Sequence, residues 1–166
     1  YDKTGLNLIT SSVRRPSPDV LDPKIHHCNL IQSILAKIEA NHAGADDALM
    51  LDSRGFVAET NATHLFIVEN GTVTTSRLVA CPEGITREVV LGLCLDNDIP
   101  YEVRDISLTE VYRADELFCT GTMGELAPVT HVDGRPIGAG NAGTTTWRLA
   151  ELFDQCVAAE AEPVLN

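Results

Sequence analysis

The stretch Cys81-Pro82-Glu83-Gly84-Ile85-Thr86-Arg87-Glu88-Val89-Val90 predicts a loop that breaks sharply and then begins a helix. Pro82 and Gly84 interrupt regular structure, and Arg87 is expected to face water. The predicted inward face comprises Ile85, Val89, Leu93 and Cys94. The first turn of such a helix presents free N–H groups that bind phosphate or carboxylate, to which Thr86 can add a hydroxyl. An ordinary capped helix without a ligand is the alternative interpretation.

Length and composition favour one acidic domain. The chain has 166 residues, and 12 basic against 24 acidic residues give a net charge of −12, which suits one domain with a buried core. The sequence contains neither a basic cluster nor an apolar run of roughly 20 residues, so nucleic acid and membranes are poor partners. Its start does not resemble a secretion signal. Five widely spaced cysteines suggest neither disulfides nor a metal site, and we expect a cytoplasmic protein with reduced thiols.

Runs of strand-like residues are separated by single helical segments. The expected strands are 6–13, 47–51, 56–59, 64–68, 72–75, 101–104, 116–120, 126–132 and 135–137. The expected helices begin near Asn29, Gly84, Ser107 and Trp147, and a proline-rich crossing loop covers 14–23. Because strands and helices do not alternate regularly, the pattern predicts an α+β fold with a mixed, largely antiparallel sheet rather than a doubly wound one.

Some local signals are specific. Asn70-Gly71 is the strongest short hairpin signal in the chain, and Asp133-Gly134 predicts a second hairpin. Ser107 predicts the cap of a short helix. The helix that begins near Asn29 carries an apolar stripe that is expected to pack inward. This stripe consists of Leu30, Ile31, Ile34, Leu35 and Ile38.

Polar loops at the ends of strands or the starts of helices form the candidate site. They are 59–64, 84–87 and 121–126. A phosphate would suit the loops at Gly84 and Gly121, through backbone N–H groups and the hydroxyls of Thr86 and Thr122. Glu59 follows an apolar strand and could give a carboxylate to a cationic ring nitrogen. This layout is expected of a pyridoxal phosphate pocket, where an acid keeps the pyridine protonated.

The chain resembles the C-terminal large domain of the class IV, fold-type IV pyridoxal phosphate enzymes. This family comprises branched-chain aminotransferases, D-amino-acid aminotransferases and aminodeoxychorismate lyases. The motifs that carry the resemblance are Ser11-Ser12-Val13-Arg14-Arg15, Asn29-Leu30, Glu59-Thr60-Asn61-Ala62-Thr63 followed by Leu65-Phe66, Pro82-Glu83-Gly84-Ile85-Thr86-Arg87, and Gly121-Thr122-Met123-Gly124-Glu125-Leu126-Ala127-Pro128-Val129. Each motif is weak alone, but their order and spacing make the resemblance specific. It implies a pseudo-barrel of sheets with packed helices.

The resemblance also implies roles for single residues. Glu59 would hold the pyridine nitrogen, the backbone of Ile85 and Thr86 with the Thr86 side chain would hold the phosphate, and Thr122 would complete the phosphate site. The alternatives are that Glu59 is a surface acid at a strand end and that Thr122 is only a turn residue.

Two further residues are candidate substrate contacts. Arg15, with its neighbour Arg14, could pair with a substrate carboxylate, and Met123 would lie beside the substrate. Exposed arginines before a proline are more often solvated loop charges, which is the alternative for both arginines.

The lysine is where the chain departs from the family. The reaction needs a lysine amine that forms the resting Schiff base and shuttles a proton. In the family this lysine stands three or four residues before an asparagine like Asn29, where this chain has His26 and Ile25. Lys24 would serve only if the loop carries a local insertion. His26 could instead act as a proton shuttle for a non-covalently bound cofactor. In a third interpretation, His26-His27 is a solvated pair in a fold without catalysis. A metal site at this pair is disfavoured, because no spacing places a third ligand.

Together these features predict a pyridoxal phosphate-dependent aminotransferase that moves an amino group between a branched-chain or D-amino acid and a 2-oxo acid. The alternatives are a lyase of the aminodeoxychorismate lyase type and a catalytically impaired binding protein, because the usual lysine position holds His26. Residues 1–166 are expected to be the cofactor-binding domain alone, with the family's small N-terminal domain absent. The resemblance implies a homodimer.

Overall fold

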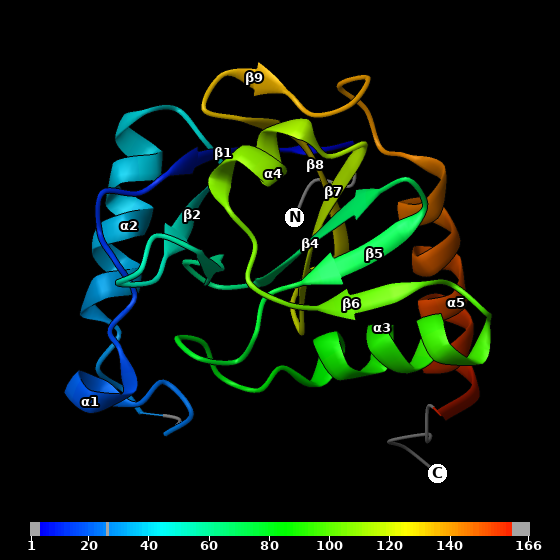
Figure 1. The fold of residues 1–166 in the computed structure, drawn as a ribbon, viewed down its shortest axis with the longest axis horizontal. Helices are drawn as coiled ribbons and strands as arrows, with labels where there is room; N and C mark the ends of the chain where they lie inside the picture. Colours follow the sequence, from blue (N-terminus) through cyan, green and yellow to red (C-terminus); the bar gives the residue numbers. More distant parts are fainter. Residues whose placement is uncertain (1–3, 26, 161–166) are drawn as a thin grey trace, which may run out of the picture.

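The computed structural model describes residues 4–25 and 27–160 (Figure 1). The strands are β1 Leu6–Thr10, β2 Asp47–Leu51, β3 Val57–Thr60, β4 His64–Glu69, β5 Thr72–Thr75, β6 Tyr101–Val103, β7 Glu116–Gly121, β8 Glu125–Val132 and β9 Arg135–Pro136. The helices are α1 Pro18–Leu21, α2 Ile31–His42, α3 Ile85–Asp96, α4 Leu108–Arg113 and α5 Thr144–Glu160. None of these helices combines the length and apolar character that crossing a membrane requires.

The strands form one mixed sheet whose spatial order differs from the chain order. Neighbouring strands follow the path β3-β2-β1-β8-β7-β4-β5-β6, and β9 pairs with β8. The strand β1 pairs in parallel with β2 and β8, β5 pairs in parallel with β6, and the remaining pairs are antiparallel. This arrangement confirms the predicted α+β class with a largely antiparallel sheet and packed helices.

Alternation along the strands builds a core on each face of the sheet, because successive side chains point to opposite sides. In β4, Leu65 is buried in the cluster that includes Val111 of α4. Its neighbour Phe66 lies in the other cluster, with residues of α3 and α5, and stacks on Phe118 of β7 with ring centroids 4.9 Å apart. The helix α4 therefore covers one face, while α3 and α5 cover the other (Figure 1).

The helix α2 packs on β2 through small side chains. Ala36 and Ala40 are fully buried, in a cluster with Ala48 and Met50 of β2. The predicted inward stripe is wrong, because its residues are each 45% to 53% exposed: Leu30, Ile31, Ile34, Leu35 and Ile38. Ala36 and Ala40 are one helical turn apart, so they lie on the same face and let the helix approach the sheet closely.

Two other expectations need correction. The crossing loop after β1 contains the one-turn helix α1, in which Pro18 occupies a first-turn position where no N–H is needed. The helix α3 lies where the sequence predicted it, and its predicted inward residues Val89, Leu93 and Cys94 pack in the core, but its first turn differs from the prediction. Ile85 is 80% exposed, whereas Arg87 is only 6% exposed, and its Nη2 donates to the carbonyl of Ser76 at 3.1 Å.

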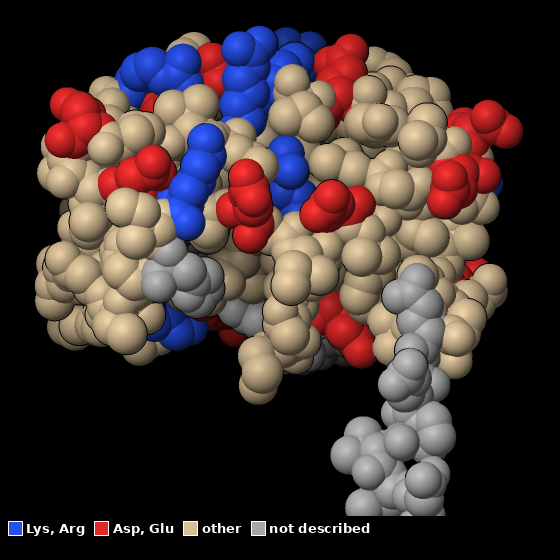
Figure 2. Space-filling view, turned by 90° about the horizontal axis from the view of Figure 1, so that it is seen from below, with Lys and Arg blue, Asp and Glu red and all other residues tan. Residues whose placement is uncertain are grey.

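The local turn and cap predictions are confirmed. Asn70 and Gly71 both have positive φ angles, of 50° and 76°, in the turn between β4 and β5. Ser107 accepts from the N–H of Glu110, whose carboxylate accepts from the N–H of Ser107, which completes a capping box. All the cysteines are free thiols. On the face seen in Figure 2, acidic and basic side chains are interspersed.

Candidate active site

Three loops that are far apart in the sequence meet at one cavity of about 270 Å³. The sheet order explains the meeting, because a short turn joins β3 to β4, and β4 pairs with β7 so that His64 lies opposite Thr120. The start of α3 closes the cavity. The lining residues are Glu59, Ala62, Thr63, His64, Pro82, Glu83, Gly84, Ile85, Thr86, Arg87, Thr120, Gly121 and Thr122.

Glu59 is a buried carboxylate in the wall of this cavity. It lies in β3 opposite Met50 of β2 and is 3% exposed, which overturns the alternative of a surface acid. Its carboxylate forms an ion pair with the guanidinium of Arg15. Arg15 also donates from Nη1 to Ser33 Oγ of α2 at 3.0 Å. Burial lowers the pKa of Arg15, although the charge interaction with Cys81 opposes this shift. The buried pair therefore carries no net charge, with the Glu59 carboxylate in the cavity wall.

The turn that follows Glu59 is fixed by its own side chains. Thr60 Oγ1 accepts from the N–H of Thr63 at 2.9 Å. Asn61 ties the turn to β2, because its Oδ1 accepts from the N–H of Ala48 at 2.7 Å and its N–H donates to the carbonyl of Ala48 at 2.9 Å. These bonds fix the backbone between Glu59 and Thr63, which both line the cavity.

The start of α3 offers the groups expected of an anion site. Gly84 is the N-cap and has no side chain to cap the helix, so the first-turn N–H groups of Ile85 and Thr86 are available to a ligand. A Cβ at Gly84 would lie 2.4 Å from Cδ2 and Nε2 of His64. A larger residue therefore does not fit at this N-cap without moving the histidine.

The end of β7 forms the opposite wall. Thr120 Oγ1 is buried and has no hydrogen-bond partner among the described residues, so it can still bind a ligand. Thr122 lies in the exposed turn after Gly121 and lines the cavity. Met123 is 93% exposed and is not among the lining residues.

Arg87 and His64 line the cavity beside the start of α3. Burial lowers the pKa of the Arg87 guanidinium against the opposing charges of Cys81 and Glu88. His64 is 7% exposed. Burial, followed by the charges of Arg87 and Arg15, lowers the pKa of His64 to about 4. The imidazole is therefore neutral near pH 7.

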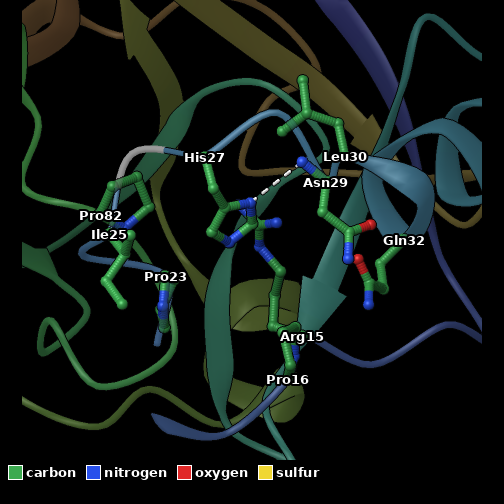
Figure 3. A pocket seen from close by; sticks show the side chains of 9 residues that line it. All are labelled: Arg15, Pro16, Pro23, Ile25, His27, Asn29, Leu30, Gln32 and Pro82. Atoms are coloured by element: carbon green, nitrogen blue, oxygen red, sulfur yellow. Dashed lines mark hydrogen bonds between the residues drawn. The ribbon is translucent and has the colours of Figure 1, made fainter. Parts of the chain in front are cut away.

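A second cavity, of about 80 Å³, adjoins the first at Pro82, which lines both. Figure 3 shows Arg15 extending toward the ring of His27, whose Nδ1 accepts from the N–H of Asn29 at 3.2 Å. Ile25 and His27 line this cavity. The predicted catalytic residue His26, which stands between them in the chain, lies outside the described residues.

The described lysines do not line the larger cavity. Lys24 is exposed, and Lys37 of α2 is ion-paired with Asp47 of β2 at 2.9 Å. Burial raises the pKa of the Cys81 thiol to about 11, and the charges of Arg87, Arg15 and Lys24 oppose this rise. The charge of Lys24 therefore interacts with Cys81, which directly precedes Pro82 in the chain. Nor do the described residues contain a group of His, Cys, Asp and Glu side chains that could hold a metal ion.

Three residues at the cavity had no predicted role in the site. His64 and Arg87 belonged to the predicted polar loops 59–64 and 84–87 without roles of their own, Arg87 being expected to face water, and Thr120 was assigned only to a strand. Their common signal is position, because His64 begins a strand beside the Glu59 loop and Thr120 precedes the Gly121 loop. Only the pairing of β4 with β7 brings the last two together.

Comparisons with known proteins agree with this site. A model of the family described as amino-transferase class IV matches residues 1–132. The branched-chain-amino-acid aminotransferase-like protein 2 of Arabidopsis thaliana is 48% identical over 165 residues, which cover 99% of this chain and 30% of the plant protein. A putative branched-chain-amino-acid aminotransferase of Methanocaldococcus jannaschii is 43% identical over 150 residues, which cover 90% of this chain and 52% of that protein.

The fold also matches solved structures. A branched-chain amino acid aminotransferase solved with pyridoxamine 5'-phosphate gives a TM-score of 0.92 at 40% identity, over 95% of this chain and 53% of that chain. The present chain therefore spans about half the length of the archaeal relative and of this solved structure, and less than a third of the plant relative.

Proposed function

The chain belongs to the class IV aminotransferase family, and from this premise we propose that it is the cofactor-binding domain of a pyridoxal phosphate-dependent aminotransferase. One observation carries the proposal: Glu59, Thr86 and Thr122, which come from three separate loops, line a single cavity. The solved relative that holds pyridoxamine 5'-phosphate supports the choice of cofactor.

The residues at the cavity fit the two ends of this cofactor. At one end, the uncapped start of α3, with the backbone of Ile85 and Thr86 and the Thr86 hydroxyl, suits a phosphate. The buried Thr120 hydroxyl, without a partner among the described residues, gives a further polar contact. At the other end, the buried Glu59 carboxylate suits a cationic ring nitrogen.

The chemistry follows from these charges. When bound, pyridoxal phosphate supplies an electron sink for bonds at the amino acid α-carbon. Glu59 would keep the ring nitrogen protonated, because a nearby carboxylate favours the charged form of a base. Arg15 would keep Glu59 ionised and in place through their ion pair.

The lysine amine is the open part of the site, and we propose that Lys24 supplies it. The Lys24 loop supports this, since Pro23 and Ile25 line the cavity that adjoins the larger one. The rival proposal is a site without a lysine, in which His26 shuttles protons for a cofactor held non-covalently. That rival is favoured by the exposed position of Lys24.

One experiment decides between them. The protein is mixed with pyridoxal phosphate and reduced with borohydride, and any pyridoxyl adduct is located by peptide mass spectrometry. We expect the adduct on Lys24, and its loss in Lys24→Met but not in the control Lys37→Met. Binding of pyridoxal phosphate without any adduct would favour the His26 site, and no binding at all would refute the proposed function.

Substrates are proposed from the names of relatives and from the site. Branched-chain amino acids are the favoured donors, because the relatives are named for them, and a 2-oxo acid is the acceptor. Arg15 lines the second cavity and Met123 follows Thr122, which supports both as substrate contacts. An assay with L-leucine and D-alanine as alternative donors tests the stereochemistry, since a D-specific enzyme would use only the latter.

We also propose a homodimer in the cytoplasm. The half-exposed apolar stripe on α2, Leu30 to Ile38, supports an interface, and the free cysteines support a reducing compartment. Sedimentation velocity of the wild-type protein and an Ile34→Glu variant tests the dimer. We expect the variant to dissociate, and a monomeric wild type would refute this part of the proposal.

A further inference from the structure

His64 is a titratable side chain at the α3 end of the cavity, and the function proposed above gives it no role. It is the first residue of β4 and is almost fully buried. Its ring lies so close to Gly84 that a Cβ there would be 2.4 Å from Nε2. The Nε2 edge of the imidazole and the first turn of α3 therefore belong to the same wall.

Thr120 lies directly opposite His64 in the β4–β7 pair, and both residues line the cavity. The buried Oγ1 of Thr120 is without a hydrogen-bond partner within residues 4–25 and 27–160. Directly opposed residues of an antiparallel pair point to the same side. Because buried polar groups are normally paired, this Thr120 hydroxyl beside His64 indicates a polar ligand.

The Arg87 guanidinium and the uncapped start of α3 favour an anionic ligand beside the ring. Arg87 faces the ring from α3 and Arg15 from the loop after β1. The carboxylate of Glu59 in β3 is already ion-paired with Arg15, and Glu83 lines the cavity from the loop before α3. The thiols of Cys81 and Cys119, whose pKa values burial raises, are neutral near pH 7.

We propose that His64 is a ligand of the cofactor phosphate, donating an imidazole N–H to it and taking up a proton as the phosphate dianion binds. The inference rests on the proposed function. Free of ligand, the ring is held neutral by burial beside Arg87 and Arg15. A bound dianion offsets those positive charges, so the protonated imidazole becomes favourable and contributes a charge-assisted hydrogen bond.

Isothermal calorimetry tests the inference without measuring catalysis. Three proteins are compared: wild type, His64→Asn and the control His42→Asn. The control histidine ends α2 on the exposed surface. Each protein is titrated with pyridoxamine 5'-phosphate and with pyridoxine, which lacks the phosphate. Repeating the titrations in buffers of different ionisation enthalpy counts the protons taken up. We expect His64→Asn to bind pyridoxamine 5'-phosphate about tenfold more weakly or worse and to take up fewer protons. The affinity of His64→Asn for pyridoxine should equal that of the wild type, and the control His42→Asn should equal the wild type with both ligands.

The outcomes separate the two proposals. If wild type binds pyridoxamine 5'-phosphate and His64→Asn equals it in affinity and proton uptake, the role of His64 is wrong while the proposed function stands. If wild type does not bind the ligand, both fail. If His64→Asn does not fold, the inference can still be tested on the wild-type protein. Adding inorganic phosphate should shift the NMR signals of the His64 ring toward those of the protonated form. Unchanged signals at saturating phosphate would overturn the inference.

Discussion

Removing Arg15 should destabilise the protein more than removing any exposed arginine. The side chains of Arg15 and Glu59 are only 13% and 4% exposed, and they form an ion pair. Arg15→Met leaves the Glu59 carboxylate buried without its counter-charge, which costs about 3–5 kcal/mol of unfolding free energy. Glu59→Gln leaves the guanidinium in the same position and should cost a similar amount.

The double variant Arg15→Met/Glu59→Gln removes both charges, so the two losses should not add. We expect a coupling energy of about 1.5–3 kcal/mol from urea unfolding of the four proteins. The exposed pair Arg113 and Glu69 is the matched control, with its atoms 3.7 Å apart and side chains 72% and 37% exposed. Its coupling should be below about 1 kcal/mol. Equal coupling in the two pairs would refute the argument that burial makes the Arg15 pair important.

Single side chains give three further predictions. Gly84→Ala should lower the unfolding free energy measured in urea by about 1–3 kcal/mol, because its Cβ would meet the His64 ring. The control Gly92→Ala lies in open space on the same helix and should raise that free energy by about 0.5–1 kcal/mol. As the pH falls from 6.5 toward 4, the unfolding free energy of wild type should decrease by up to about 3 kcal/mol, because only the unfolded histidine takes up a proton in that range. The unfolding free energy of His64→Asn should not show this decrease. A thiol reagent should label the exposed Cys28 rapidly and leave native Cys119 unlabelled, because burial raises the pKa of that thiol to about 12.

Each of these predictions can be contradicted by one result. Equal unfolding energies for the two glycine variants would show that the His64 ring moves freely. An identical pH dependence in wild type and His64→Asn would show that the folded histidine titrates normally. Labelling of Cys119 as fast as Cys28 would show that the core around β7 opens readily.

Much of the fold could be predicted because its elements depend on neighbours in the chain. The turn at Asn70-Gly71 needs positive φ angles that these residues tolerate. The cap at Ser107 needs only the side chain of Glu110, three residues later. The loops of the candidate site were found for the same reason, since they stand at strand ends and a helix start.

The buried face of α2 and the burial of Arg87 in the first turn of α3 could not be predicted in this way. Helical spacing identified a large apolar stripe on α2. The opposite face of the helix packs on the sheet instead, because Ala36 and Ala40 allow a closer approach. Likewise, Arg87 was predicted to be a solvated charge, yet it is buried beside the cavity in the first turn of α3.

The sequence by itself therefore determined where strands, turns and helices begin, and which loops carry polar groups, because backbone conformation depends on nearby residues. Only the tertiary structure decided which of these groups meet. The pairing of β4 with β7 brings His64 opposite Thr120, although they are 56 residues apart in the chain. Burial then pairs Arg15 with Glu59 and lowers the pKa of His64, because removal from water penalises charge and makes each partner matter.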